Sequence, residues 1–66
     1  MERGMKRRDF ERHLRKHGCV FAKEGARHTA FINTANRKIA AVPRHTELKK
    51  GVVLGICKAL EIPDPF

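Results

Sequence analysis

The spacing of apolar residues changes twice along this chain, and this change limits the folds available to it. Within residues 6–17, side chains recur at the spacing of one helix face: Phe10, His13, Leu14 and His17. Gly18 follows as a helix stop, so a helix is predicted over 6–17. Between residues 19 and 44 the pattern becomes one of short strands and polar turns.

The middle of the chain predicts three strands, over residues 19–22, 27–33 and 37–44. Pro43 lacks a backbone N–H for the ladder, so the third strand is expected to end beside it. Because the connecting turns are short, we expect an antiparallel meander with 27–33 in the middle. Within 27–33, alternation puts His28, Ala30 and Ile32 on one side of the sheet but does not say which side is covered.

Helical spacing returns at residue 48 or 49 and continues to residue 61. The apolar stripe of this helix consists of Val53, Ile56, Cys57 and Leu60. Because each helix has one apolar face, both are expected on the same face of the sheet. The predicted class is α+β, a two-layer fold in the order helix, strand, strand, strand, helix. The 66 residues provide for a single domain over 1–66, with 1–4 as a short extension and 63–66 as a tail.

Charge points to the kind of partner. Lys and Arg number 15 against 7 Asp and Glu, which gives a formal net charge of +8 and favours a polyanion, either nucleic acid or an acidic protein. No apolar run approaches the length of a membrane span, and no secretory signal is present, so no membrane partner is expected. Two cysteines, Cys19 and Cys57, indicate a reducing, cytoplasmic setting and are interpreted as core residues.

The segment Gly-Ala-Arg-His-Thr-Ala-Phe at residues 25–31 is the sharpest candidate for chemistry. A neutral His28 can take a proton from a ribose 2′-hydroxyl, and Arg27 can stabilise charge on the phosphate. RNA supplies its own nucleophile in that hydroxyl, so no metal and no cofactor are expected. The alternative is a partly exposed strand histidine without chemistry.

Three further histidines are weaker candidates. His45 follows the third strand, and antiparallel pairing would bring it near His28 as a helper in phosphate binding or proton donation; the alternative is a solvated loop residue. His13 and His17 have metal-ligand spacing, but the stretch lacks a further well-spaced ligand. Both are therefore interpreted as helix-face residues.

Basic residues form two groups. The first helix carries Lys6, Arg7, Arg8, Arg12, Arg15 and Lys16, and the second group consists of Arg44, Lys49 and Lys50. The last two lie at a predicted helix N-terminus, where phosphate oxygens are favoured. With no Trp, no Tyr and four Phe, the sequence predicts poor base-stacking platforms.

Several short motifs, in order, resemble the HicA-type (YcfA-like) mRNA interferase toxins. The motifs are residues 5–10, 14–18, 25–29, 42–45, 47–51 and 56–60, and the likeness covers about 5–62. The resemblance implies a double-stranded-RNA-binding-domain-like fold, which agrees with the element order predicted above. It also implies an endoribonuclease toxin that cleaves mRNA and is neutralised by a HicB-type antitoxin.

The family's catalytic histidine falls on His28, whereas the neighbouring serine or second histidine of many members is replaced by Arg27 and Thr29. The resemblance gives a phosphate-contact role to Arg7, Arg8, Arg27, Arg44, Lys49 and Lys50, and His45 joins them as an RNA-binding candidate because of its expected position near His28. Two other hypotheses about function remain open. One is a non-catalytic RNA-binding module that recognises duplex shape, and the other is a subunit that only docks an acidic protein.

Overall fold

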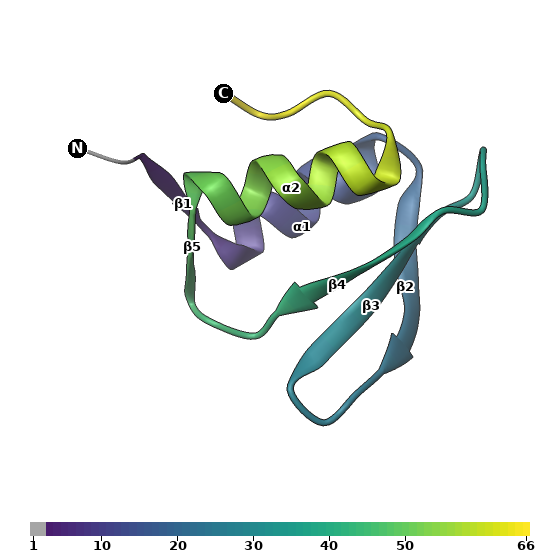
Figure 1. The fold of residues 1–66 in the computed structure, drawn as a ribbon, viewed down its shortest axis with the longest axis horizontal. Coiled ribbons are helices and arrows are strands. Elements are labelled where there is room, and N and C mark those ends of the chain that lie inside the picture. The colour runs from purple at the N-terminus through teal and green to yellow at the C-terminus, as the bar shows by residue number, and fades with distance from the viewer. Residues whose placement is uncertain (1–2) are drawn as a thin grey trace.

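The fold is taken from a computed structural model, which describes residues 3–66 (Figure 1). The elements, in chain order, are β1 (Gly4–Lys6), α1 (Arg7–Lys16), β2 (Cys19–Glu24), β3 (His28–Asn33), β4 (Ile39–Pro43), β5 (Glu47–Lys49) and α2 (Lys50–Leu60). Strands β2, β3 and β4 form an antiparallel sheet in that order. The predicted α+β class and the central position of β3 are confirmed.

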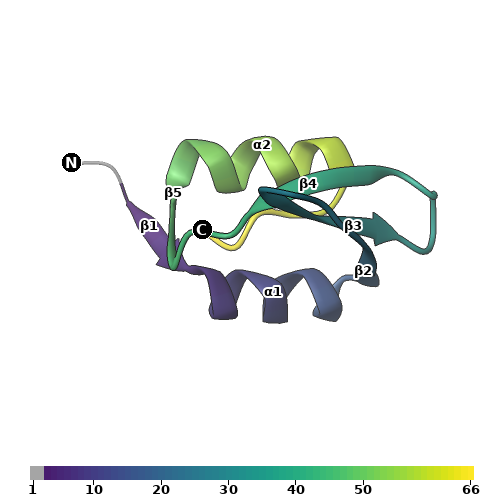
Figure 2. The same ribbon diagram turned by 90° about the horizontal axis from the view of Figure 1, so that it is seen from below.

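Both helices cover the same face of this sheet, as predicted. They run in the same direction along the molecule, α1 near β2 and α2 near β4 (Figures 1 and 2). Alternation along β3 shows which face is covered: Thr29, Phe31 and Asn33 are buried, whereas His28 is exposed. His28 therefore projects from the open face of the sheet.

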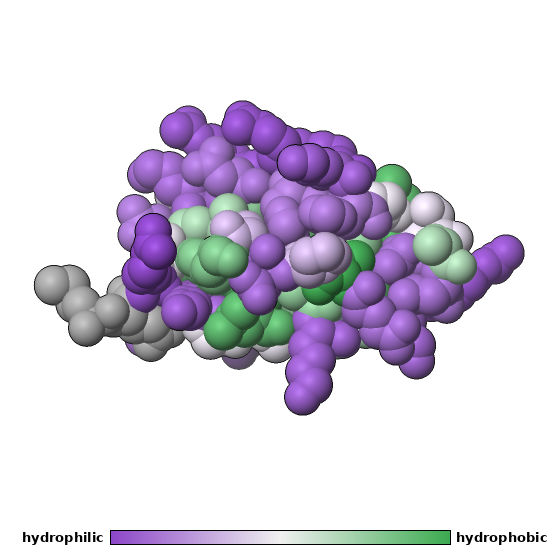
Figure 3. Space-filling view, turned by 90° about the horizontal axis from the view of Figure 1, so that it is seen from above, coloured by the Kyte–Doolittle hydropathy of each residue, from purple (hydrophilic) through white to green (hydrophobic). Residues whose placement is uncertain are grey.

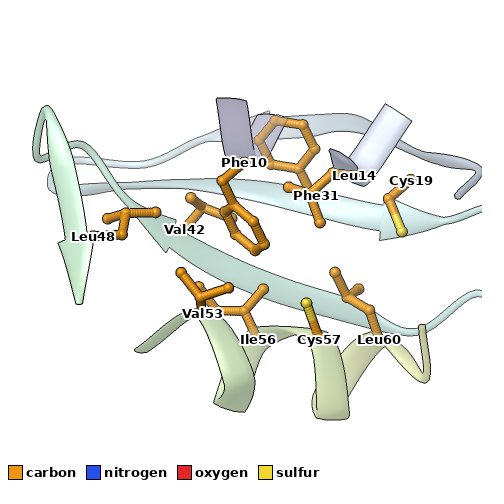
Figure 4. Close-up of a cluster of buried hydrophobic side chains, with 10 residues drawn as sticks. All are labelled: Phe10, Leu14, Cys19, Phe31, Val42, Leu48, Val53, Ile56, Cys57 and Leu60. Carbon is orange, nitrogen blue, oxygen red and sulfur yellow. The ribbon is translucent and has the colours of Figure 1, made fainter. Parts of the chain in front are cut away.

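The core lies between the two helices and the sheet (Figure 4). Its buried residues are Phe10, Leu14, Cys19, Phe31, Val42, Leu48, Val53, Ile56, Cys57 and Leu60. The two cysteines are free and buried, as predicted. Burial raises the pKa of the Cys19 thiol. Burial, then the charges of Asp64 and Cys19, raise the pKa of Cys57 to about 11.

Helix α1 matches its prediction to within one residue at each end. Phe10 and Leu14 are its buried residues, and they form the apolar face expected from the spacing. Gly18 follows with φ +80°, a left-handed conformation that glycine adopts without steric cost. The predicted stop is therefore confirmed in its physical detail.

The start of the second helix was predicted wrongly. Leu48 and Lys49 belong to β5, which pairs antiparallel with β1, and α2 begins at Lys50. Leu48 is only 3% exposed, so its side chain joins the core from a strand. A pattern of apolar spacing does not distinguish this arrangement from one more helical turn.

Strand β1 also changes the expected extension. Gly4 pairs with Lys49, and a Cβ at Gly4 would lie 2.6 Å from the carbonyl oxygen of Leu48, so glycine permits this close approach. Residues 1 and 2 of the expected extension lie outside the described residues. Residues 63–66 have no regular secondary structure, and the backbone of Pro63 contacts His13.

The strand boundaries in the middle of the chain differ from the prediction. Strand β2 continues to Glu24 through a bulge between Phe21 and Lys23, and β3 begins at His28 rather than Arg27. Arg37 was placed in the third strand but adopts φ 65° in the turn. Side-chain bonds explain this turn, because Asn33 Oδ1 accepts from the backbone of Ala35 at 2.9 Å.

Among residues 3–66, neither helix has the length and apolar character that a membrane crossing requires.

Candidate functional site

His28 stands at the first position of β3, where the central strand reaches the rim of the sheet. It pairs in register with Pro43, the last residue of β4. Strand β4 ends there, so Arg44 and His45 continue beside the beginning of β3. The pairing that was expected to bring His45 towards His28 is therefore present.

These segments border an open cavity at the surface, of about 530 Å³, which we call the histidine cavity. Its lining residues are Ala26, Arg27, His28, Pro43, Arg44 and His45. Two histidines and two arginines that the sequence singled out thus share one cavity, although residues 29–42 separate the two segments along the chain.

Three of these side chains have no partner within residues 3–66. The imidazole rings of His28 and His45 make no hydrogen bond to another described residue. The guanidinium of Arg27 makes no hydrogen bond or ion pair with any described residue. All three residues are exposed. Within residues 3–66, the cavity therefore presents to solvent two imidazoles and one guanidinium that bind no other side chain.

Arg44 is engaged differently, because its guanidinium holds the loop that precedes His28. It donates to the carbonyl oxygens of Gly25, of Ala26 at 3.2 Å and of His28 at 3.4 Å. It also forms an ion pair with Glu24 at 2.6 Å. Hydrogen bonds from a charged donor are the stronger kind, and five donors in a fixed fork suit several acceptors at once. Arg44 therefore fixes the position of the backbone around His28.

Thr29 connects this loop to the first helix. Its buried hydroxyl accepts from Arg7 at 3.1 Å and from Arg44 at 3.4 Å, and it donates to Glu24 at 3.2 Å. Arg7 also pairs with Glu11 at 3.0 Å. The predicted phosphate-contact residues Arg7 and Arg44 are thus already bonded to protein atoms.

The remaining predicted basic residues lie outside the histidine cavity. Arg8 is exposed on α1 and is 3.9 Å from Asp9. Lys49 lines a separate cavity of about 420 Å³ that His45 also borders. Lys50 lies 5.7 Å from the centre of the Phe66 ring. Hydrophilic side chains crowd the side of the molecule on which α1 lies (Figure 3).

The two helix histidines have a packing role in this structure. His13 Nε2 lies 2.6 Å from the carbonyl oxygen of Pro63, so that the ring nitrogen donates to it, and the His13 and His17 ring centres are 4.5 Å apart. No cluster of three or more potential metal ligands occurs in the part of the chain that the structure describes. The interpretation of both as helix-face residues agrees with these contacts.

Thr29 and Glu24 were not identified as site residues from the sequence. Their signal is the β2–β3 register, which places Glu24 directly opposite Thr29. A hairpin with the shorter β2 that the sequence predicted would leave Glu24 in the turn. The bulge at residue 22 shifts the register of β2, and this shift places the Glu24 carboxylate opposite the Thr29 hydroxyl.

A family model described as the HicA toxin of bacterial toxin-antitoxin matches residues 7–62 of the 66-residue chain. This span contains both helices, the three-stranded sheet and every residue that lines the histidine cavity. A search of curated proteins found no match, and neither did a search of solved structures.

Proposed function

The chain belongs to the HicA toxin family of bacterial toxin–antitoxin systems, and from this premise we propose that it is an endoribonuclease that cleaves mRNA without a metal ion. One observation carries the proposal: an exposed His28 shares a cavity with Arg27 and His45, and none of these side chains is committed to a protein partner within residues 3–66. Reactive groups that bind nothing inside the protein are free to meet a substrate.

The reaction begins at the ribose on the 5′ side of the cleaved bond. The neutral imidazole of His28 takes the proton of the 2′-hydroxyl, and the oxygen attacks the adjacent phosphorus. The bond from phosphorus to the 5′-oxygen then breaks. The products are a 2′,3′-cyclic phosphate and a 5′-hydroxyl, so atoms and charge balance without a cofactor.

The neighbouring residues supply the other roles. His45 donates the proton that the leaving 5′-oxygen requires, because it borders the same cavity. Arg27 stabilises the negative charge that grows on the phosphate oxygens. Arg44 is a positioning residue, since its guanidinium is occupied by Glu24 and the loop carbonyls. Arg8, Lys49 and Lys50 attract the RNA backbone through charge.

The proposed inhibitor is a HicB-type antitoxin that covers His28 with an acidic surface. A net charge of +8 accelerates the encounter with a polyanionic substrate and with an acidic protein alike. Because mRNA is the substrate, we place the activity in the cytoplasm.

The decisive experiment expresses the protein without any antitoxin and incubates the purified protein with RNA in a chelating buffer. The wild type should arrest growth and cut RNA, while His28→Ala and His28→Gln should lose about 10² to 10⁴-fold in cleavage rate. His17→Ala is the matched control, because it removes a histidine outside the cavity. End-group analysis should find cyclic phosphate and 5′-hydroxyl termini.

Equal cleavage by wild type and His28→Ala would remove the catalytic role. Binding without cleavage would favour a non-catalytic RNA-binding module, and binding should then still weaken steeply with salt. Activity that disappears with the chelator would show that a metal takes part. Binding to an acidic protein alone, with no affinity for RNA, would leave only a docking subunit.

A further inference from the structure

A second cavity, of about 320 Å³, opens between α1 and the β2–β3 hairpin. We call it the Phe21 cavity. Glu11 and Arg15 of α1 form one side, Phe21 and Glu24 of β2 form another, and Arg44 closes the end. Arg44 also lines the histidine cavity, so the two cavities share one wall.

Phe21 is the unusual residue in this cavity. It pairs in register with Phe31 on the covered side of the sheet, yet it is 58% exposed whereas Phe31 is 3% exposed. The bulge that follows Phe21 twists the edge strand at this point. A large aromatic ring is thus presented to solvent inside a cavity, which costs free energy unless something stacks on it.

The paired charges in the cavity suit the edge of a nucleobase. Each carboxylate is matched by an arginine: Glu11 lies 3.0 Å from Arg7 and 3.7 Å from Arg15, and Glu24 lies 2.6 Å from Arg44. The lining therefore sets carboxylate acceptors beside guanidinium donors, and the edge of a base likewise offers both donors and acceptors. Carboxylates accept from the amino group of a base, and guanidiniums donate to its ring nitrogens and carbonyls.

We propose that the Phe21 cavity holds one base of the RNA strand that is cleaved at His28, with the ring of Phe21 stacked on that base. The inference rests on the function proposed above. Phe21 lies opposite Phe31, which is three residues from His28, or about 10 Å along β3. Phe21 is on the covered face of the sheet and His28 on the open face, so the RNA strand passes from one to the other around the rim, where Arg44 borders both cavities. The base therefore belongs to a nucleotide close to the cleaved bond, and Phe21 makes cleavage depend on that nucleotide.

The test measures binding of short single-stranded RNA whose 2′-hydroxyls are methylated, so that the wild type binds without cutting. Phe21→Ala should weaken binding by about five- to a hundredfold, because stacking on one base contributes that much. Phe21→Trp should restore binding, whereas Phe21→Leu should not, since leucine keeps apolar area but has no aromatic face. Ile39→Ala is the matched control, because Ile39 is an equally exposed apolar residue, 59%, on β4 and outside the cavity.

A second arm replaces one base of the RNA at a time by an abasic site. At one position the wild type should lose affinity, and Phe21→Ala should lose nothing more, because its stacking is already gone. The same position should govern the cleavage preference on ordinary RNA. Circular dichroism checks that each variant is folded.

The outcomes separate this inference from the proposed function. If the wild type cuts RNA but Phe21→Ala binds as tightly as Ile39→Ala, the base cavity is refuted and the nuclease stands. If the wild type binds RNA without cutting it, the nuclease is refuted, and the same variants still decide whether Phe21 stacks on a base. If the wild type neither binds nor cuts RNA, both proposals fall.

Discussion

The two turns at the ends of β3 are held in opposite ways. At the β3–β4 turn, neutral amide side chains form the stabilising hydrogen bonds. Asn33 is buried, and its Nδ2 donates to the carbonyl oxygen of Leu60 at 2.8 Å. Asn36 donates to the same carbonyl at 3.2 Å. At the β2–β3 turn, the guanidinium of Arg44 binds the backbone from outside.

The difference follows from what each turn must leave open. The asparagine turn bonds the carbonyl oxygen of Leu60, the last residue of α2, and fixes the sheet to the helix, so the amide of Asn33 is buried and hydrogen-bonded and that of Asn36 is half-buried. The arginine turn binds its backbone carbonyls but leaves His28 and Arg27 exposed. A long charged side chain can order a loop without covering it, and this lets a chain of 66 residues combine a fixed backbone with an accessible imidazole.

The largest loss of stability should come from Asn33→Ala. The substitution leaves the buried carbonyl of Leu60 with one weaker partner and removes the Asn33 bond to Ala35, so the free energy of unfolding should fall by about 3 kcal/mol. Urea unfolding measures this, with Asn36→Ala as the milder control because Asn36 is half-buried. The rate of RNA cleavage per folded molecule should be unchanged. A loss of this rate would contradict the assignment of the asparagine turn to stability alone.

High pH should lower the free energy of unfolding through the buried Cys57 thiol of α2, the helix to which the asparagine turn is bonded. Below pH 9 the Cys57 thiol is protonated in both the folded and the unfolded state. Between pH 9 and about 11 only the unfolded thiol loses its proton, so the folded state loses about 2 kcal/mol over this range. Urea midpoints at successive pH values measure the slope. Cys57→Ala should flatten it, and an unchanged slope would assign the effect to other groups.

Thr29→Val tests the junction between the arginine turn and the first helix. Valine keeps the shape of threonine but removes the hydroxyl that binds Arg7, Arg44 and Glu24, and the loss of stability should be about 1 to 2 kcal/mol. Cleavage should also fall, because the backbone at His28 is no longer tied to α1. Thr29→Ser should recover both properties. Recovery of stability alone would separate the network from the site.

The smallest change in stability should come from Arg44→Gln. Its partners are partly exposed, so the free energy of unfolding should fall by less than about 1 kcal/mol. The cleavage rate should nevertheless fall tenfold or more, because the loop at His28 loses its clamp. Parallel unfolding and cleavage assays measure the ratio of the two effects. A large loss of stability with an unchanged rate per folded molecule would make Arg44 a structural residue only.

Local spacing predicted the regular elements well and their ends less well. The stripe of Phe10 and Leu14 and the stop at Gly18 are local properties, and so the extent of α1 followed from them. Arg37 was misplaced because the bonds that bend the chain there come from Asn33 and Asn36, whose side chains also reach α2. Leu48 was misplaced because its strand partner, Met5, is distant in the sequence.

The candidate site divides in the same way. Sequence alone singled out His28, its arginine neighbour and His45, because the residue types that can move a proton or hold a phosphate are recognisable wherever they stand. The sequence also determined the order of helix, three strands and helix, because the periodicity of apolar residues depends only on neighbouring positions in the chain. Only the tertiary structure decided that His28 faces away from the helices, because both faces of β3 carry apolar residues. The bonds of Arg44 and the exposure of Phe21 were likewise decided there, because each depends on segments that meet only when the sheet and α1 pack together.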